Sequence, residues 1–143
     1  ELWSSKDMTV KLLGVDFGTK NVGFALGNSL TKASVNFFSF SYKEKAQLSQ
    51  KIIDICEEWE VNKIVFGMPF NSDGSKNKMC RQIEKFSKKI ASQIEEVDIF
   101  FQDENFTSTE YKIEQRNNNI SSLNESHGYA AKLILESFMR EQL

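Results

Sequence analysis

The sequence predicts an α/β protein formed as a single domain, in which helices flank a mixed sheet of five strands. Three observations predict this class. Three apolar, strand-like segments come first, later apolar segments alternate with amphipathic helical patterns, and neither a repeat nor a linker interrupts this order. The chain of 143 residues is long enough for one hydrophobic core and too short for two. We therefore expect three antiparallel strands followed by β-α-β units.

The first half of the chain is predicted to hold three strands and a helix. Residues 10–15 are mostly apolar and lead into Asp16-Phe17-Gly18, which is typical of a buried strand that ends in a tight turn. Residues 21–26 and 34–41 have the pattern of two further strands. Apolar side chains recur every three or four positions over residues 43–60, so we expect an amphipathic helix there.

The second half is predicted to alternate strands and helices. We expect a short strand at 63–66, a helix beginning near Lys76, a strand at 98–102 and a last helix over 123–141. Thr107 and Glu110 have the spacing of a capping box, which indicates a further helix beginning directly after Asp103-Glu104. The asparagine- and serine-rich residues 116–122 are expected to form a mobile loop.

The composition limits the possible functions. Hydrophobic residues make up 40% of the chain, which is typical of a globular protein, and no apolar run approaches the length needed to span a bilayer. The formal net charge is −2, which argues against a protein that holds nucleic acid by bulk charge alone. Any such contact must therefore use a local basic patch.

The chain's beginning and its two cysteines indicate the compartment. Residues 1–7 lack the charged and long apolar segments of a secretion signal and precede Met8, so we expect them to be an addition to a chain that natively starts at Met8. Cys56 and Cys80 lie in helical patterns without the spacing of a zinc site. We therefore expect a protein of the reducing cytoplasm, with no membrane segment.

Two acidic residues stand where predicted strands end. Asp16 follows the first strand and Glu104 follows the fifth, so both would reach the same sheet edge if these two strands pair. Neighbouring carboxylates repel unless a cation lies between them, and Mg²⁺ or Mn²⁺ suits such oxygen ligands. The alternatives are a turn aspartate that bonds to its own loop and an Asp103-Glu104 pair that favours the next helix N-terminus.

His127 is the only histidine, and it shares a helical face with apolar residues including Ala131 and Ile134. A single histidine on an apolar face is more often a satisfied core residue than a ligand. From the residues alone, both interpretations stay open.

A turn-rich segment and a basic helix face could contact phosphates. Residues 67–75 leave a predicted strand and enter the helix, so their backbone amides could meet an anion. Between Lys76 and Lys89 there are six basic residues and one acidic residue, Glu84. The alternative is an ordinary β-α connection followed by a solvated helix face.

Four segments, taken in order, resemble the YqgF/RuvX family, whose members are described as Holliday junction resolvases or pre-16S rRNA nucleases. The first is Gly14-Val15-Asp16-Phe17-Gly18-Thr19-Lys20-Asn21-Val22-Gly23, and the second is the loop from Gly67 to Ser75. The third is Asp103-Glu104-Asn105-Phe106-Thr107-Ser108, and the fourth is His127-Gly128-Tyr129-Ala130-Ala131. The resemblance covers residues 12–143.

This resemblance implies an RNase H-like fold with an acidic triad that coordinates Mg²⁺ or Mn²⁺. The catalytic and metal-binding positions fall on Asp16, Glu104 and His127. His127 stands where the family has a carboxylate, and a neutral imidazole favours Mn²⁺ relative to Mg²⁺. Asn21 and Asn105 replace family arginines, which removes two forked phosphate donors. The implied nucleic-acid contacts are Lys20, Asn71, Lys78, Arg81, Lys85, Thr107 and Ser108.

The expected function is therefore a metal-dependent endonuclease that acts on structured nucleic acid, with the 5′ end of precursor 16S rRNA as the expected substrate. One alternative is a Holliday junction resolvase that cuts branched DNA, and another is a catalytically weak member that only binds nucleic acid. A third is an ATP-handling protein, because Asp16-Phe17-Gly18-Thr19-Lys20-Asn21 also resembles the first phosphate loop of the actin group. The protein is expected to act as a monomer or a homodimer.

Overall fold

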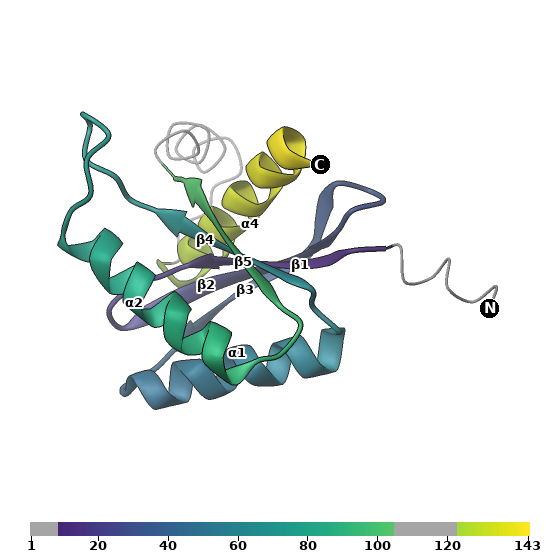
Figure 1. Cartoon of the computed structure of the whole chain (residues 1–143), viewed down its shortest axis with the longest axis horizontal. Helices are drawn as coiled ribbons and strands as arrows, with labels where there is room; N and C mark the ends of the chain where they lie inside the picture. Colours follow the sequence, from purple (N-terminus) through teal and green to yellow (C-terminus); the bar gives the residue numbers. More distant parts are fainter. Residues whose placement is uncertain (1–8, 105–122) are drawn as a thin grey trace.

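A five-stranded mixed sheet organises residues 9–104 and 123–143, the part of the chain that the computed structural model describes (Figure 1). The strand order is β3-β2-β1-β4-β5. The first three strands pair antiparallel, whereas β4 lies parallel to both β1 and β5. The strands are β1 (Lys11–Asp16), β2 (Asn21–Asn28), β3 (Ala33–Ser41), β4 (Lys63–Met68) and β5 (Asp98–Asp103).

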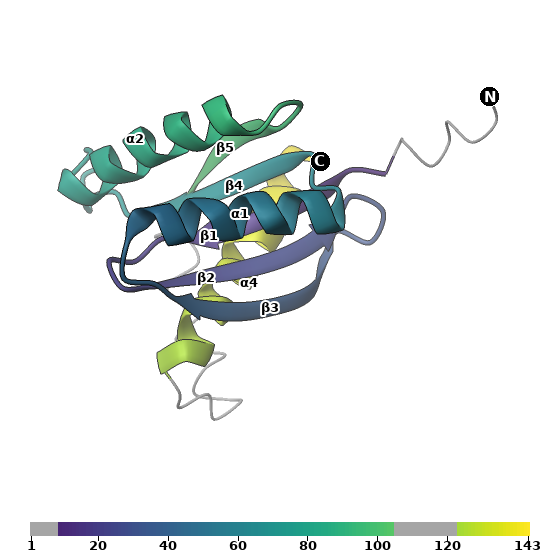
Figure 2. The same ribbon diagram turned by 90° about the horizontal axis from the view of Figure 1, so that it is seen from below.

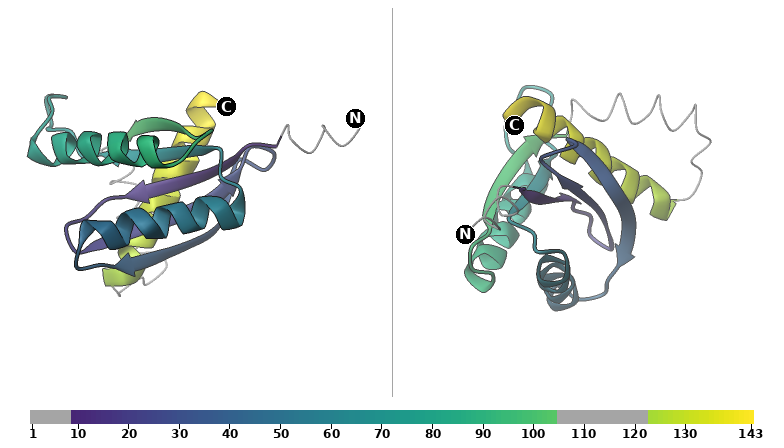
Figure 3. Two further views of the ribbon diagram at one scale, coloured as in Figure 1. Left: turned by 60° about the horizontal axis from the view of Figure 1, so that its bottom comes forward. Right: turned by 90° about the vertical axis from the view of Figure 1, so that its right-hand side faces the viewer.

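Helices cover both faces of this sheet. Helices α1 (Lys45–Trp59) and α2 (Lys78–Gln93) lie side by side on one face (Figure 2). Helix α4 (Leu123–Gln142) crosses the opposite face, where it packs on β1, β2 and β3 (Figure 3). The order of layers is therefore helices, sheet, helix, as the alternating pattern of the sequence predicts.

The two faces of each strand feed two separate cores, because successive side chains point to opposite sides of a sheet. On β1, Leu13 and Val15 pack with α1 and α2, whereas Leu12 packs against α4. Asp16 has the same parity as Leu12, so its side chain belongs to the α4 face. Burial on both faces explains why the central strands are almost continuously apolar.

The helix starts follow local capping chemistry. The side chain of Asn77 accepts a hydrogen bond from the Cys80 backbone N–H at 3.0 Å, which fixes where α2 begins. At the start of α1, Glu44 and Gln47 form a reciprocal capping box. The two cysteines are buried free thiols, one in each helix.

The predicted elements are confirmed where the structure describes them, with one correction. The fifth strand pairs with β4 and not with β1, so the pairing on which the meeting of Asp16 and Glu104 depended is wrong. Both residues nevertheless reach one edge, because β1, β4 and β5 are mutually parallel. The expectations for residues 1–7, for the helix after Glu104 and for the loop at 116–122 lie outside the described residues.

No described helix has the length and apolar character that crossing a bilayer would require.

Candidate metal centre

The carboxyl ends of the parallel strands bring Asp16 and Glu104 to one edge of the sheet. Asp16 is the last residue of β1, and Glu104 directly follows β5. Strand β4 lies between these two strands, and its Met68 carbonyl accepts a hydrogen bond from the Glu104 backbone N–H at 3.1 Å. This bond extends the β4–β5 ladder by one residue and fixes where the Glu104 side chain begins.

A glycine on the intervening strand leaves room for the two carboxyl groups to meet. On β4, Gly67 lies on the face of the sheet that α4 covers, as Val65 does. A Cβ atom built on Gly67 would lie 3.0 Å from Oε2 of Glu104. The same Cβ would also collide with Cδ1 of Ile134. The missing side chain at this position therefore lets Glu104 reach across β4 toward Asp16.

The surroundings of Glu104 favour the protonated form of its carboxyl group. Burial, the charge of Asp16 and a hydrogen bond to the Asp16 side chain together raise the pKa of Glu104 from 4.5 to about 8. The neighbouring Asp103 contributes a smaller repulsion in the same direction. The protonated Glu104 carboxyl thus donates a hydrogen bond to Asp16, and one proton lies between two carboxyl groups.

His127 approaches Asp16 from helix α4. Its Nδ1 atom lies 3.4 Å from Oδ2 of Asp16, and the two side chains are 27% and 17% exposed. The hydrogen bond to Asp16 raises the pKa of His127, although partial burial works in the opposite direction. His127 is therefore a partner of Asp16 at the sheet edge, and not a core residue.

Close packing of α4 on β2 fixes the position of His127. A Cβ atom on Gly23 would overlap the backbone carbonyl of His127, so only glycine allows the helix to approach this closely. One residue later, the Gly128 N–H donates a hydrogen bond to Oγ of Ser39 at 3.0 Å. These contacts fix how closely α4 approaches β2 and β3, and they place the His127 imidazole beside Asp16.

The three side chains have the donor chemistry of a divalent cation site. Carboxylate oxygens are the ligands that Mg²⁺ and Mn²⁺ prefer, and burial together with the charge of Asp16 raises the pKa of Glu104, as expected where a nearby positive charge would be favourable. Among the side chains that the structure describes, those of residues 9–104 and 127–143, no three His, Cys, Asp or Glu residues are already arranged as a metal-binding group. Asp16 is the common neighbour of Glu104 and His127.

The described residues that were expected to contact phosphate lie in three other regions: the β1–β2 turn, the β4–α2 connection and helix α2. Lys20 is exposed in the turn between β1 and β2, and its carbonyl accepts a hydrogen bond from the Tyr42 N–H at 3.0 Å. Asn71 braces its own loop, because its amide donates to Oγ of Ser75 at 3.0 Å and its carbonyl oxygen accepts from Asn77 at 3.2 Å. Asn71 therefore holds the β4–α2 connection in shape.

The expected basic face is present on α2, where Lys78, Arg81 and Lys85 are all exposed. It lies on the sheet face opposite α4, so these cations are not grouped around Asp16 and His127. Thr107 and Ser108, the remaining expected contacts, lie outside the described residues.

Three contributions to the site were not predicted from the sequence. Gly67 leaves space for the Glu104 side chain. Ser39 accepts a hydrogen bond from the Gly128 N–H of α4, and the charge of Asp103 helps to raise the pKa of Glu104. Strand parity could have indicated Gly67, because it falls on the same face as Asp16 once β4 is placed beside β1. The contact of Ser39 depends on how α4 crosses β3, for which the sequence carries no local signal.

Proteins of similar sequence have consistent names. A family model described as "RuvX: Holliday junction resolvase" matches residues 10–141. A protein named "Putative pre-16S rRNA nuclease" from Buchnera aphidicola is 33% identical over 138 residues, which covers 89% of this chain and 94% of that protein. A protein of the same name from Saccharophagus degradans is 32% identical and covers 91% and 93%.

Solved structures show the same fold at low sequence identity. A Thermus thermophilus RuvC structure matches with a TM-score of 0.61 and 7% identity, over 93% of this chain and 96% of that one. A Fowlpox virus resolvase in complex with Holliday junction DNA matches with a TM-score of 0.57 and 9% identity, over 94% and 99%. These likenesses confirm the expected RNase H-like fold. Because the family model matches nearly the whole chain, this protein belongs to the RuvX family.

Proposed function

We propose that this protein is a metal-dependent endonuclease that hydrolyses phosphodiester bonds in structured nucleic acid at the edge formed by Asp16 and Glu104. The observation that carries the proposal is the meeting of these two side chains at the carboxyl ends of β1 and β5, where burial and the charge of Asp16 raise the pKa of Glu104 to about 8. Holding two carboxyl groups together in a partly buried place is costly, which supports a functional role for the pair.

The proposed ligands are Asp16, Glu104 and His127. When bound there, Mg²⁺ or Mn²⁺ would polarise the phosphoryl oxygen and lower the pKa of an attacking water. Glu104 would lose its proton as the cation binds, so occupation of the site would depend on pH. His127, which faces Asp16 through Nδ1, would orient that carboxylate or offer its ring nitrogen as a ligand.

The remaining expected residues would position the substrate through its phosphates. Lys20 lies at the end of the β1–β2 turn, four residues after Asp16, and is exposed. The α2 face with Lys78, Arg81 and Lys85 would supply the sequence-independent attraction that an acidic protein otherwise lacks. Asn71, Thr107 and Ser108 complete the proposed contacts.

Precursor 16S rRNA, cut near its 5′ end, is the proposed substrate. Relatives that carry a pre-16S rRNA nuclease name match more than nine tenths of their own length, so the likeness extends over the whole domain. Branched DNA is the second candidate, which the description of the matching family model favours. We place the protein in the cytoplasm, where its two free thiols would stay reduced, and propose that it acts as a monomer or a homodimer.

A cleavage assay with Asp16→Asn tests this function. Precursor rRNA, single-stranded RNA and a four-way DNA junction would each be incubated with Mg²⁺ or Mn²⁺. We expect Asp16→Asn to lower the cleavage rate on the order of a hundred- to a thousand-fold, because it removes the central carboxylate. Asp54→Asn, which changes an exposed carboxylate on α1, is the matched control. Equal rates for Asp16→Asn and wild type would refute the proposal, and nucleic-acid binding without any cleavage would identify a catalytically weak member.

A further inference from the structure

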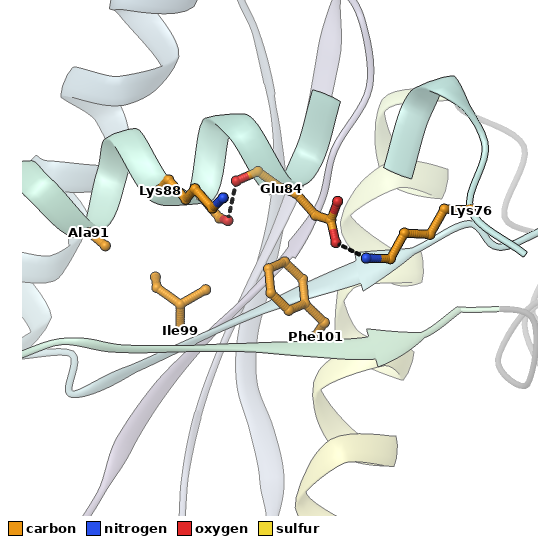
Figure 4. A pocket seen from close by; sticks show the side chains of 7 residues that line it. Lys76, Glu84, Lys88, Ala91, Ile99 and Phe101 are labelled. Carbon is orange, nitrogen blue, oxygen red and sulfur yellow. Dashed lines mark hydrogen bonds and ion pairs between the residues drawn. The ribbon is translucent and has the colours of Figure 1, made fainter. Parts of the chain in front are cut away.

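A groove lies between helix α2 and strand β5, on the opposite face of the sheet from α4. It has a volume of about 390 Å³, which is within the range of sites that hold small ligands or single ligand groups. Figure 4 shows the groove, with Lys76 beside the end of β5 and Ala91 toward the strand's beginning. Its lining consists of Lys76, Glu84, Ser87, Lys88, Ala91, Ile99 and Phe101.

The floor of the groove is an exposed aromatic ring on an edge strand. Phe101 is 42% exposed, although it belongs to a strand that is paired along its whole length with β4. Beside it on β4 lies its strand partner, the fully buried Phe66, whose ring centroid is 6.3 Å from that of Phe101. Phe66 in turn packs edge-on against Phe86 of α2. One side of the exposed ring therefore contacts packed aromatic side chains.

The rim of the groove is basic. Lys88 is exposed on α2 and forms no ion pair with any residue that the structure describes. Lys76 is held over the groove by an ion pair with Glu84, the one acidic side chain in the lining. Lys85 and Lys89 are exposed on the same helix. An aromatic floor with a cationic rim is the arrangement that binds the base and the phosphate of a single-stranded nucleic acid.

The groove opens at the same sheet edge as the candidate metal centre. Phe101 precedes Glu104 by three residues on the chain, and its side chain lies on the other face of β5. Lys76 directly precedes Asn77, whose amide donates a hydrogen bond to the carbonyl of Pro69, just beyond the end of β4. A strand leaving the groove past Lys76 therefore arrives at the carboxyl ends of β4 and β5.

From these observations we infer that the groove receives an unpaired nucleotide of the substrate, with its base stacked on Phe101 and its phosphate beside Lys88. The inference rests on the proposed nuclease function and narrows its substrate to nucleic acid with a single-stranded segment next to the cut. A duplex keeps its bases stacked on each other and cannot supply this nucleotide. A protein segment is less suited, because the cationic rim has only Glu84 to meet a partner's positive charge.

The test measures binding without cleavage. Fluorescence titrations in EDTA would use a single-stranded RNA that contains 2-aminopurine, whose emission falls when the base stacks, and a labelled RNA duplex of equal length. Phe101→Leu keeps an apolar side chain but removes the aromatic face, and Phe101→Tyr keeps the ring. Phe37→Leu is the matched control, because Phe37 is 38% exposed on β3, the opposite edge strand.

We expect Phe101→Leu to weaken single-strand binding by about five- to a hundred-fold and to abolish the quenching of 2-aminopurine. Phe101→Tyr and Phe37→Leu should bind within about two-fold of wild type, and the affinity for duplex should stay the same in all four proteins. The inference is wrong if Phe101→Leu binds the single strand like wild type, or if Phe37→Leu loses as much affinity. It is also wrong if sedimentation shows a wild-type dimer that Phe101→Leu dissociates, since a second copy would then fill the groove.

The two proposals fail in different ways. If Asp16→Asn cuts as fast as wild type while Phe101→Leu still loses single-strand binding, the proposed nuclease site is wrong and the proposed nucleotide groove is supported. If Asp16→Asn loses cleavage while Phe101→Leu binds the single strand like wild type, the proposed nuclease site is supported and the proposed nucleotide groove is wrong.

Discussion

The Glu104 carboxyl group donates a hydrogen bond to Asp16 across β4, a strand that contributes only a glycine at the crossing point. The two residues are 88 positions apart in the chain, and their strands do not pair with each other. The hydrogen bond therefore offsets part of the repulsion that two carboxylates at this distance would have. Most of the expected behaviour of this site follows from that relationship.

Glu104→Gln is expected to change how stability depends on pH. Because the pKa of Glu104 is raised from 4.5 to about 8, the folded protein keeps this proton while the unfolded chain releases it. The wild-type free energy of unfolding should fall between pH 4.5 and 8 relative to that of the variant, by at most about 1.4 kcal/mol per pH unit. The amide that this substitution introduces would still donate to Asp16.

Urea unfolding in EDTA at several pH values measures this difference. Below pH 4.5, where Glu104 is neutral in the folded and the unfolded protein, the free energies of unfolding of wild type and variant should change with pH in parallel. Above pH 8 they should again run parallel, with the wild type lowered by a constant amount. Glu58→Gln, at an exposed carboxylate on α1, serves as the comparison. A wild type whose stability rises across this range relative to Glu104→Gln would contradict the assignment.

Two glycine substitutions should separate helix docking from carboxylate placement. Gly23→Ala forces a methyl group into the rigid backbone of His127, so we expect a loss of stability of roughly 3 kcal/mol. Gly67→Ala meets the flexible end of Ile134 and the Glu104 carboxyl, so a loss of about 1 kcal/mol is expected together with a weaker affinity for Mn²⁺. Urea denaturation and Mn²⁺ titration calorimetry measure both effects. Equal stability losses would show that α4 adjusts at Gly23.

Replacing His127 by aspartate should shift metal preference toward Mg²⁺. The added negative charge strengthens binding of a hard cation, so the ratio of Mg²⁺ to Mn²⁺ affinity should rise by about ten-fold. Without metal, the extra carboxylate beside Asp16 should lower the melting temperature, and Mg²⁺ should restore it. His127→Asn has the same size as the aspartate variant without the charge and isolates its effect. An unchanged affinity ratio would place His127 outside the ligand set.

The basic face of α2 should set the salt dependence of nucleic-acid binding. Lys78→Gln, Arg81→Gln and Lys85→Gln, each exposed on α2, should lower the slope of log affinity against log salt by about 0.7 per residue for a single strand. Lys45→Gln, an exposed lysine at the start of α1, should leave the slope as it is. Filter binding between low and moderate salt measures these slopes. If Lys45→Gln changes the slope as much as the α2 variants do, the attraction is not local to α2.

The local features of the fold and of the candidate site could be predicted from the sequence. Apolar alternation placed the strands, the 3.6-residue period placed α1 and α2, and the turn after Asp16 marked a carboxylate at a strand end. Strand pairing was predicted less well, because apolar runs that are buried on both faces do not say which neighbour they have. The fifth strand accordingly pairs with β4 instead of β1.

By itself the sequence determined which side chains could serve a metal centre, since carboxylates at strand ends and a histidine on a helix face are local patterns. Only the tertiary structure decided that Glu104 crosses Gly67 to share a proton with Asp16, that Gly23 seats His127 beside them, and that Phe101 faces a groove. The physical reason is that pKa values and close approaches depend on distances between segments, which chain order alone does not encode.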